Sequence, residues 1–404
     1  MKKTARIHIA LALVCGGLWG CQQPTAARLP TPPAPTATAT PRPAASSSAV
    51  PVASPAPTTN PSSVTPLPSG APSPSVEPSS PSGAPVIQAR YVGQLFYQWD
   101  CLAGQGNCSQ SAYAQQWQSL GVQTTGNPLL KRWLTLKNTL DRTRVLSTQI
   151  SPLAEPLVFQ SQNTWDQVRV AALTSDTLNT FSANITPLMG TAERDEMVSI
   201  LQSLSDTFFE DWWQQEGKSQ AESLIQRYQE TFDAYALDDF INQVSNFYEI
   251  SAEQRQALQF HLLLQAPGAE DLSFAEQILA HGILEVSSSQ SPHSQLDVML
   301  HEMTHYFFKQ LPATTQAQIQ NFFAQQTEPE AMSAYHLFDE SLATAIGNGY
   351  INQKVLRPDF FARMQTTPLS FFNDPWIDTN GKALFNVDLL FKGQTITADS
   401  FLSA

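Results

Sequence analysis

The stretch from residue 22 to residue 86 most limits what this chain can fold into. It holds 18 of the 29 prolines in the 404-residue sequence, no aromatic residue and only three charged ones. Such a segment cannot bury enough apolar surface to offset the conformational entropy that is lost on ordering. We therefore expect residues 22–86 to form a disordered, partly polyproline II tether. The folded part then begins near residue 87.

The residues before the tether have the pattern of a secretory signal. A basic start precedes a short apolar run over residues 7–14, which is too short to cross a bilayer. The sequence LWGC follows at 18–21 and resembles the bacterial lipobox. That resemblance implies that residues 1–21 are a lipoprotein signal peptide and that Cys21 is lipidated and becomes the new N-terminus. The alternative is an ordinary secretory signal that is cleaved further on, for instance after Ala27.

The lipobox resemblance also implies a location. A chain lipidated on Cys21 is held on a membrane of the bacterial cell envelope, because several acyl chains on one residue anchor stably. Gln22 follows this cysteine, whereas an Asp there resembles an inner-membrane retention signal. We therefore expect the outer membrane, with the protein on its periplasmic or surface face.

Charge narrows the range of partners. Residues 87–404 carry 17 basic and 34 acidic side chains, so the folded part is strongly acidic. Nucleic-acid binding requires a basic patch or stripe, and we expect no nucleic-acid partner. A folded part of this length is large enough to bury a substantial core.

Two of the four cysteines lie in the folded part, in the sequence DCLAGQGNCS. In an oxidising envelope compartment we expect Cys101 and Cys108 to form a disulfide; two free thiols are the alternative. Their spacing excludes a CxxC redox motif. A zinc site built on this pair is not expected, because no histidine or third cysteine lies nearby.

The folded part changes character near residue 250. Residues 87–250 carry apolar side chains at three- and four-residue spacing, which predicts a mostly helical region. Within residues 251–404, short apolar runs at 257–267 and 278–289 predict strands, and helical periodicity follows them. The expected fold class is therefore α+β, with a helical region in front of a second region that contains a small sheet.

The sequence HEMTH, residues 301–305, lies in a predicted helix that ends at Pro312. His301 and His305 are four residues apart and share one face of a helix, so both imidazoles can bind one metal ion. Glu302 can reach a water molecule at that ion. The alternative is an ordinary amphipathic helix with two satisfied histidines. The apolar residues around the motif argue against it, because buried histidines need partners.

A catalytic zinc site needs a third protein ligand. The metzincin pattern HExxHxxGxxH has a glycine and a third histidine where this chain has Phe308 and Leu311, so the metzincin class is excluded. Glu340 follows His305 by 35 residues. It lies in a helix that we expect to run from about residue 329 until Gly347 and Gly349 end it, and it can supply the third ligand. Glu328 and Glu330 are less well placed, because they lie in a turn that contains a proline.

This arrangement resembles the gluzincin branch of zinc metallopeptidases, which has a thermolysin-like architecture. The resemblance covers roughly residues 255–350. It implies a zincin-like catalytic domain with a small sheet, an HExxH helix and a downstream glutamate helix. It also implies that His301, His305 and Glu340 bind Zn²⁺, and that an edge strand, for which we assign residues 281–289, binds an extended peptide.

The same resemblance assigns roles to other residues. Glu302 acts as the general base and then as the acid. Asp339 and Thr344 are candidates to support the ligand histidines, although relatives of the thermolysin type have Asp at the position of Thr344. Tyr350 is the first candidate to stabilise the oxyanion. Tyr335 and His336 are the next candidates for this role. We expect His281 and His293 to lie at the surface.

The sequence therefore predicts a lipid-anchored zinc metallopeptidase that hydrolyses peptides or proteins in the bacterial cell envelope. One alternative is a catalytically silent zincin-fold lipoprotein that acts as a binding or assembly factor. Another is a lipoprotein without a metal, whose helical region binds a partner. An intact Glu302 favours the enzyme, because a purely structural metal site does not need a base.

Overall fold

The computed structural model describes residues 21–24, 85–104, 108–141, 164–267, 272–327, 331–359, 361–385 and 395–396. Most of the predicted signal and tether lies outside these residues. Two short pieces differ from that prediction, because Cys21–Pro24 form strand β1 and Val86 begins strand β2, Val86–Gln88. Residues 1–27 and 83–404 form one compact unit, to which the helical region and the sheet-containing region both belong.

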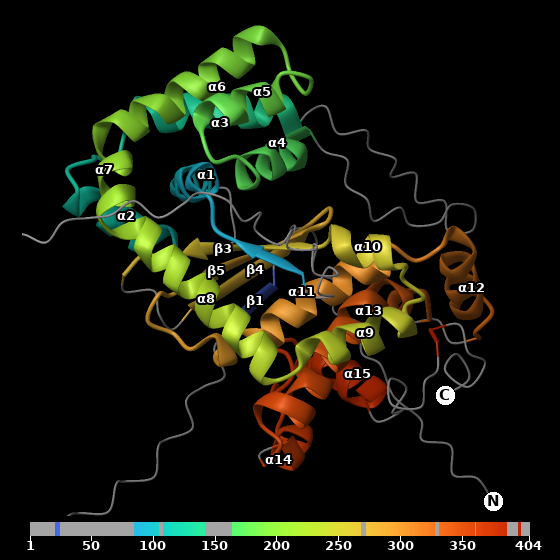
Figure 1. Ribbon diagram of the computed structural model, residues 1–404. Helices are drawn as coiled ribbons and strands as arrows, with labels where there is room; N and C mark the ends of the chain where they lie inside the picture. Colours follow the sequence, from blue (N-terminus) through green and yellow to red (C-terminus); the bar gives the residue numbers. More distant parts are fainter. Residues whose placement is uncertain are drawn as a thin grey trace, which may run out of the picture. The chain divides into compact units, whose positions relative to one another are not determined.

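Helices precede the main strands, and further helices follow them (Figure 1). The first set comprises α1 (Tyr91–Leu102), α2 (Gln110–Ser119), α3 (Pro128–Asp141), α4 (Thr164–Leu173), α5 (Leu178–Ile185), α6 (Thr191–Leu204), η1 (Ser205–Phe209), α7 (Glu210–Trp212), η2 (Trp213–Gly217), α8 (Lys218–Ala234), α9 (Leu237–Phe247) and α10 (Ala252–Ala257). The second set comprises η3 (Pro292–Ser294), α11 (Leu296–Lys309), α12 (Ala313–Ala324), α13 (Ala331–Ala343), η4 (Thr344–Tyr350), η5 (Asn352–Leu356), α14 (Phe361–Thr366) and α15 (Pro375–Phe385). The mixture of helices and a small sheet confirms the α+β class.

The sheet has the strand order β1-β4-β5-β3-β2. Its central strands are β3 (Gln259–Leu264), β4 (Leu272–Ile278) and β5 (His281–Val286). The strands β2, β3 and β5 run parallel, whereas β4 is antiparallel to both β5 and β1. The sheet is therefore mixed.

The two faces of the sheet are covered by different parts of the chain. Leu263 and Ile283 pack with Leu173 of α4 on the face that the early helices cover. Side chains of the opposite parity, such as Leu262 and Leu284, point to the other face, where α11 crosses the sheet (Figure 1). The central strands β3 and β5 are thus covered on both sides, which agrees with their mostly buried residues.

A side chain of the helical region completes one strand edge. β2 pairs only with the first three residues of β3, so the rest of that edge would leave backbone groups unpaired. Gln94 of α1 fills the gap: its amide nitrogen donates to the Leu262 carbonyl at 2.6 Å, and its amide oxygen accepts from the Leu264 N–H at 2.8 Å. The helical region therefore supplies hydrogen bonds that the sheet needs.

A disulfide and a buried ion pair link parts of the helical region. Cys101 and Cys108 form the expected disulfide at the end of α1. Close by, the Lys137 ammonium of α3 lies 2.9 Å from the Asp100 carboxylate, and both side chains are 8 % exposed. The Trp133 indole N–H donates to the same carboxylate at 2.9 Å. A buried charge pair of this kind has no sequence signature that we could read.

The sheet corrects two expectations. Residues 272–278 were not expected to form a strand, yet they form β4 and pair with β5, which starts directly after the turn at Leu279 and Ala280. Leu279 adopts a positive φ of 52°, a conformation that two-residue hairpin turns usually give to Gly or Asn. Because β4 exists, β5 lies inside the sheet, and the assignment of residues 281–289 to an edge strand is wrong.

Glu285 of β5 makes stability depend on pH. Burial raises the pKa of this carboxyl to about 7, although hydrogen bonds from Ser109 and Tyr97 act in the opposite direction. The folded protein therefore holds a proton that the unfolded chain loses near pH 4.5, and the free energy of unfolding should fall by about 3 kcal/mol between pH 4.5 and 7. Chemical denaturation at several pH values should show this loss in the wild type and not in Glu285→Gln. An unchanged slope in the variant would contradict the prediction.

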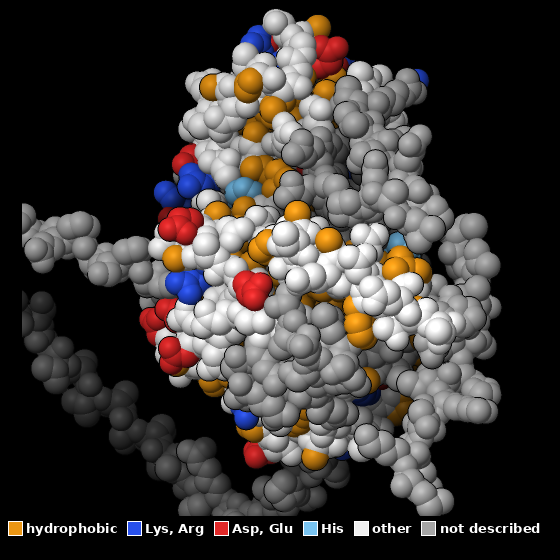
Figure 2. Space-filling model, turned by 90° about the vertical axis from the view of Figure 1, so that its right-hand side faces the viewer, with side chains coloured by type: hydrophobic (Ala, Val, Ile, Leu, Met, Phe, Trp, Pro, Cys, Tyr) orange, Lys and Arg blue, Asp and Glu red, His pale blue; other side chains and the backbone are white. Residues whose placement is uncertain are grey.

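The surface of the described part is mixed in character. On the face shown in Figure 2, basic and acidic side chains lie in small groups, and hydrophobic side chains are scattered among polar ones. Large hydrophobic side chains such as Val86, Leu369 and Trp376 are exposed one at a time along the chain. Within the described residues, no helix combines the length and the apolar character that crossing a membrane requires.

Candidate metal centre

Helix α11 carries the HEMTH sequence. It begins at Leu296, after the short turn η3, and its residues from Leu296 to Phe308 are all buried. The apolar residues on both sides of the motif explain this, because α11 packs on the sheet with one side and against α13 and η4 with another. The two histidines therefore lie in the interior, as their sequence context predicts.

His301, His305 and Glu340 converge, and together they could hold a metal ion. One ligand atom of each lies within 4.8 Å of the others. The Nε2 atoms of the two histidines are 3.1 Å apart. The Glu340 oxygens lie 3.1 Å from His301 Nε2 and 3.2 Å from His305 Nε2. His301 is fully buried, whereas the Glu340 side chain remains 23 % exposed.

Two acceptors hold the other nitrogen of each imidazole. Asp339 Oδ2 lies 3.0 Å from His305 Nδ1, and Asn348 Oδ1 lies 3.0 Å from His301 Nδ1. With the proton on Nδ1, where these acceptors can bind it, a neutral imidazole presents a lone pair at Nε2. Two lone pairs and a carboxylate facing one another at these distances repel unless a positive charge lies among them. The arrangement thus suits a bound cation.

The surroundings of Glu340 favour its charged form. Burial alone would raise it, but the adjacent His305 and His301 hold the pKa of this carboxyl well below its usual range. Glu340 is therefore a carboxylate at neutral pH, which is the form that binds a metal ion.

Glu302 lies next to the first ligand histidine and is 2 % exposed. Burial raises the pKa of its carboxyl above the usual value, while His305 and His301 act against this rise. Among the described residues, its Oε1 atom has no hydrogen-bond partner. A buried carboxylate oxygen without a partner is costly, so this atom is suited to bind a small polar group such as a water molecule.

Asp339 fulfils the supporting role that was expected of it, but Thr344 does not. Thr344 is fully buried, and its hydroxyl has no hydrogen-bond partner among the described residues. Its methyl group packs so closely on Gly381 of α15 that a Cβ there would lie 2.6 Å away. The partner of His301 is instead Asn348, which sequence reasoning missed. The available signal was an Asn between two glycines, eight residues after Glu340.

The expected end of the glutamate helix at Gly347 and Gly349 is also wrong. The chain remains helical there and continues as the π-helical segment η4. A Cβ at Gly347 would lie 2.5 Å from the backbone nitrogen and Cα of His301. The absence of a side chain at Gly347 therefore allows η4 to touch α11, and this is a packing role rather than a helix-ending one.

The oxyanion candidates occupy other positions. Tyr350 is buried, its ring packs on Phe385, and its hydroxyl donates to the Phe385 carbonyl at 3.2 Å. This donor is committed elsewhere, so the expected role of Tyr350 is not supported. Tyr335 packs against another aromatic ring and His336 is exposed.

The two remaining histidines also differ from each other. His293 contacts the ring of Tyr235 and is partly exposed, in keeping with its assignment to the surface. His281 is buried and lies 2.9 Å from His261 in the sheet, so its assignment to the surface is wrong. Burial is the principal cause that lowers the pKa of both sheet histidines, to about 4 for His281 and about 3 for His261.

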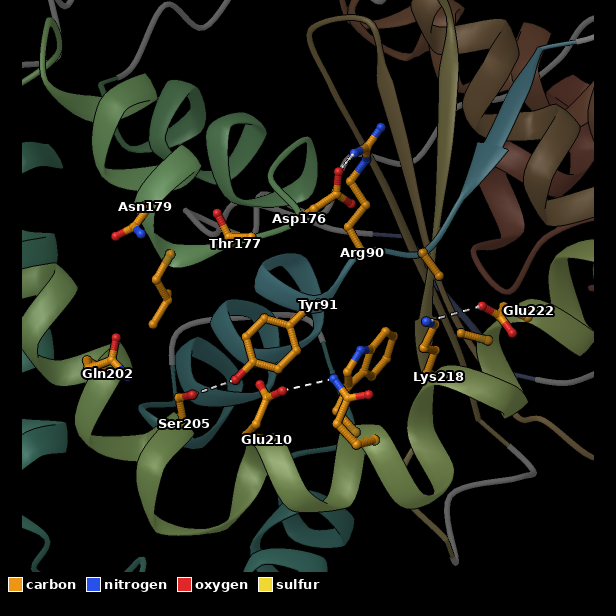
Figure 3. A pocket seen from close by; sticks show the side chains of 15 residues that line it. Arg90, Tyr91, Asp176, Thr177, Asn179, Gln202, Ser205, Glu210, Lys218 and Glu222 are labelled. Atoms are coloured by element: carbon orange, nitrogen blue, oxygen red, sulfur yellow. Dashed lines mark hydrogen bonds and ion pairs between the residues drawn. The ribbon is translucent and has the colours of Figure 1, made fainter.

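A hollow of about 580 Å³ lies in the helical region (Figure 3). Its lining includes Arg90 and Tyr91 at the start of α1, Asp176 before α5, and Ser205 and Trp213 of the π-helical segments. The Tyr91 and Ser205 hydroxyls are 2.6 Å apart, as the dashed line in Figure 3 marks. The three residues of the metal-binding group do not line this hollow, so the two features are distinct.

No protein-family model, no curated protein and no solved structure matches the chain. What the metal centre can do therefore follows from the chemistry and the geometry of its own residues.

Proposed function

We propose that the chain is a zinc-dependent peptidase of gluzincin type. The observation that carries this proposal is the convergence of His301 Nε2, His305 Nε2 and the Glu340 carboxylate beside a buried carboxylate, Glu302, that has a free oxygen. Three protein ligands and a neighbouring base form the donor set of a catalytic zinc site, which leaves one position open for substrate. A purely structural zinc site uses four protein ligands and no base.

The distances favour zinc over larger cations. Zinc lies about 2.0–2.1 Å from histidine nitrogen and carboxylate oxygen, so the edges of its coordination tetrahedron are about 3.3 Å long. The two Nε2 atoms lie 3.1 Å apart, Glu340 Oε1 lies 3.1 Å from that of His301, and Glu340 Oε2 lies 3.2 Å from that of His305. Calcium and magnesium prefer six or more oxygen ligands, which this pair of imidazoles cannot provide.

The reaction needs a base and an acid in one place. Bound zinc would supply a Lewis acid that polarises a carbonyl and acidifies a water molecule. Glu302 accepts the proton of the attacking water and then passes it to the nitrogen of the leaving amine. The burial that raises the pKa of this carboxyl brings it closer to neutral pH, where such a shuttle works best. The two imidazoles keep their Nδ1 protons on Asn348 and Asp339, away from the reacting atoms.

The lipobox-like sequence supports a location of this activity in the bacterial envelope. We propose that Cys21, the first residue of strand β1, carries the lipid anchor. The substrate would then be a peptide or protein of the envelope.

Metal removal tests the proposal. We expect purified protein to contain about one zinc ion per chain, and a chelator should lower its rate of casein hydrolysis on the order of 100-fold or more. Adding back Zn²⁺, but not Mg²⁺, should restore the rate. Protein that contains no zinc above trace levels, or hydrolysis that survives complete chelation, would overturn the proposal.

A further inference from the structure

We propose that Asn348 is a positioning residue that decides which nitrogen of His301 is available to a metal ion. The inference deepens the proposed function, and it rests on that proposal only for the identity of the metal. Asn348 Oδ1 lies 3.0 Å from His301 Nδ1, and both residues are buried. An acceptor at Nδ1 keeps the proton there and leaves the lone pair on Nε2, which faces the ligand group.

Without Asn348 the proton has a competing position. Glu340 Oε1 lies 3.1 Å from His301 Nε2, so a proton on Nε2 would be accepted by this carboxylate. The ring of Phe372 stacks on the imidazole at 5.9 Å, and His301 is 0 % exposed. Solvent therefore cannot readily replace the amide oxygen of Asn348. An imidazole protonated on Nε2 cannot bind the metal ion at that atom, and metal affinity falls.

The π-helical segment explains why the positioning residue is Asn348. In an uninterrupted α-helix, residues 344 and 347 would share the face of Glu340. A π turn contains one additional residue, so η4 advances the register by one position after Thr344. The backbone of Gly347 then touches α11 beside His301, and residue 348 takes the position that faces the imidazole. Thr344, before this change of register, packs on Gly381 of α15 instead.

Asn348 is fixed by its own neighbours. The side-chain amide nitrogen of Asn352 donates to the backbone carbonyl of Asn348 at 2.6 Å. The same nitrogen lies 3.4 Å from Asp297 Oδ2. Asp297 lies in the first turn of α11, and its other oxygen accepts from the Val298 N–H at 3.0 Å. The supporting residues thus connect η4 back to the helix that carries His301, so the imidazole and its acceptor keep the same relative position.

The test reads the proton and the metal separately. In metal-free purified protein, long-range ¹H–¹⁵N correlation should find His301 protonated on Nδ1, with its signal assigned by loss in His301→Gln. Asn348→Leu, which keeps the branched shape of the side chain, and Asn348→Ala should both move the proton to Nε2. Both should weaken zinc binding about 10- to 100-fold in competition with a chromogenic chelator. Asn348→Asp keeps an acceptor and should retain the Nδ1 proton and most of the affinity.

Thr344→Val is the matched control, because it removes a buried hydroxyl from the same segment without removing a partner of His301. It should leave the proton position and the zinc affinity unchanged. The inference fails if Asn348→Leu and Asn348→Ala keep both wild-type properties, or if Thr344→Val weakens zinc binding as much as they do. Wild-type protein that binds no zinc would contradict the proposed function. The position of the His301 proton would still decide the role of Asn348.

Discussion

The Glu302→Gln variant should keep its zinc and lose nearly all hydrolysis. Glutamine has the size of glutamate but cannot accept the proton of the attacking water, so we expect casein hydrolysis to slow by about 10²- to 10⁴-fold. Glu302 is not among the three converging ligands, so metal content should match that of the wild type. The rate of casein hydrolysis and the zinc content, measured on the same preparations, check both parts of this result.

Glu285→Gln provides the control for that comparison. It makes the same substitution at another buried glutamate, on the far face of the sheet from α11, and it should leave the rate of hydrolysis unchanged near neutral pH. A Glu302→Gln protein that hydrolyses casein at the wild-type rate would remove Glu302 from the mechanism. A variant that loses its zinc would instead make Glu302 part of the metal-binding group. Wild-type protein that holds zinc and hydrolyses nothing would favour the catalytically silent alternative.

The Lys137→Ala variant should lower the free energy of unfolding by about 3–5 kcal/mol. It removes the cation beside the Asp100 carboxylate, which is 8 % exposed. The carboxylate then keeps the hydrogen bond from the Trp133 indole N–H. An unpaired buried charge is far more costly than the pair was stabilising. Denaturant unfolding of both proteins checks the size of the loss.

The exposed pair of Lys218 and Glu222 provides the contrast. Its charges lie 3.9 Å apart on the surface of α8, so Lys218→Ala should change the free energy of unfolding by at most about 1 kcal/mol. Combining Lys137→Met with Asp100→Leu should recover much of the loss, because an apolar pair needs no charge partner. Equal losses for Lys137→Ala and Lys218→Ala would show that burial does not govern the effect.

The sequence predicted correctly those pairs of side chains whose spacing along the chain brings them together. His301 and His305 share a helix face, and Cys101 and Cys108 lie close enough to bond, so both pairs could be predicted locally. Glu340 was harder, because it comes from a second helix. It was identified because the chemistry of a catalytic metal site requires a third ligand.

The errors arose where backbone geometry departs from the regular patterns. The turn before β5 uses a leucine with positive φ, so no Gly or Asn marked it, and β4 was missed. Thr344 was chosen because the gluzincin resemblance points to the residue one turn after Glu340. The observed acceptor, Asn348, lies in a π-helical segment that hydrophobic periodicity does not reveal. The glycine beside Asn348 suggested the end of a helix, whereas it permits contact between two helices.

The hydrogen bonds of the Gln94 side chain to β3 limit the ways in which the proposed peptidase could be regulated. Because this side chain completes the hydrogen bonding of β3, and α4 covers Leu263 and Ile283, the helical region is not a removable prosegment. Cleavage between α10 and the sheet, followed by release of the helices, would expose an unpaired strand edge and an apolar sheet face. We therefore expect control of the proposed activity to act on the intact unit rather than through removal of the helices.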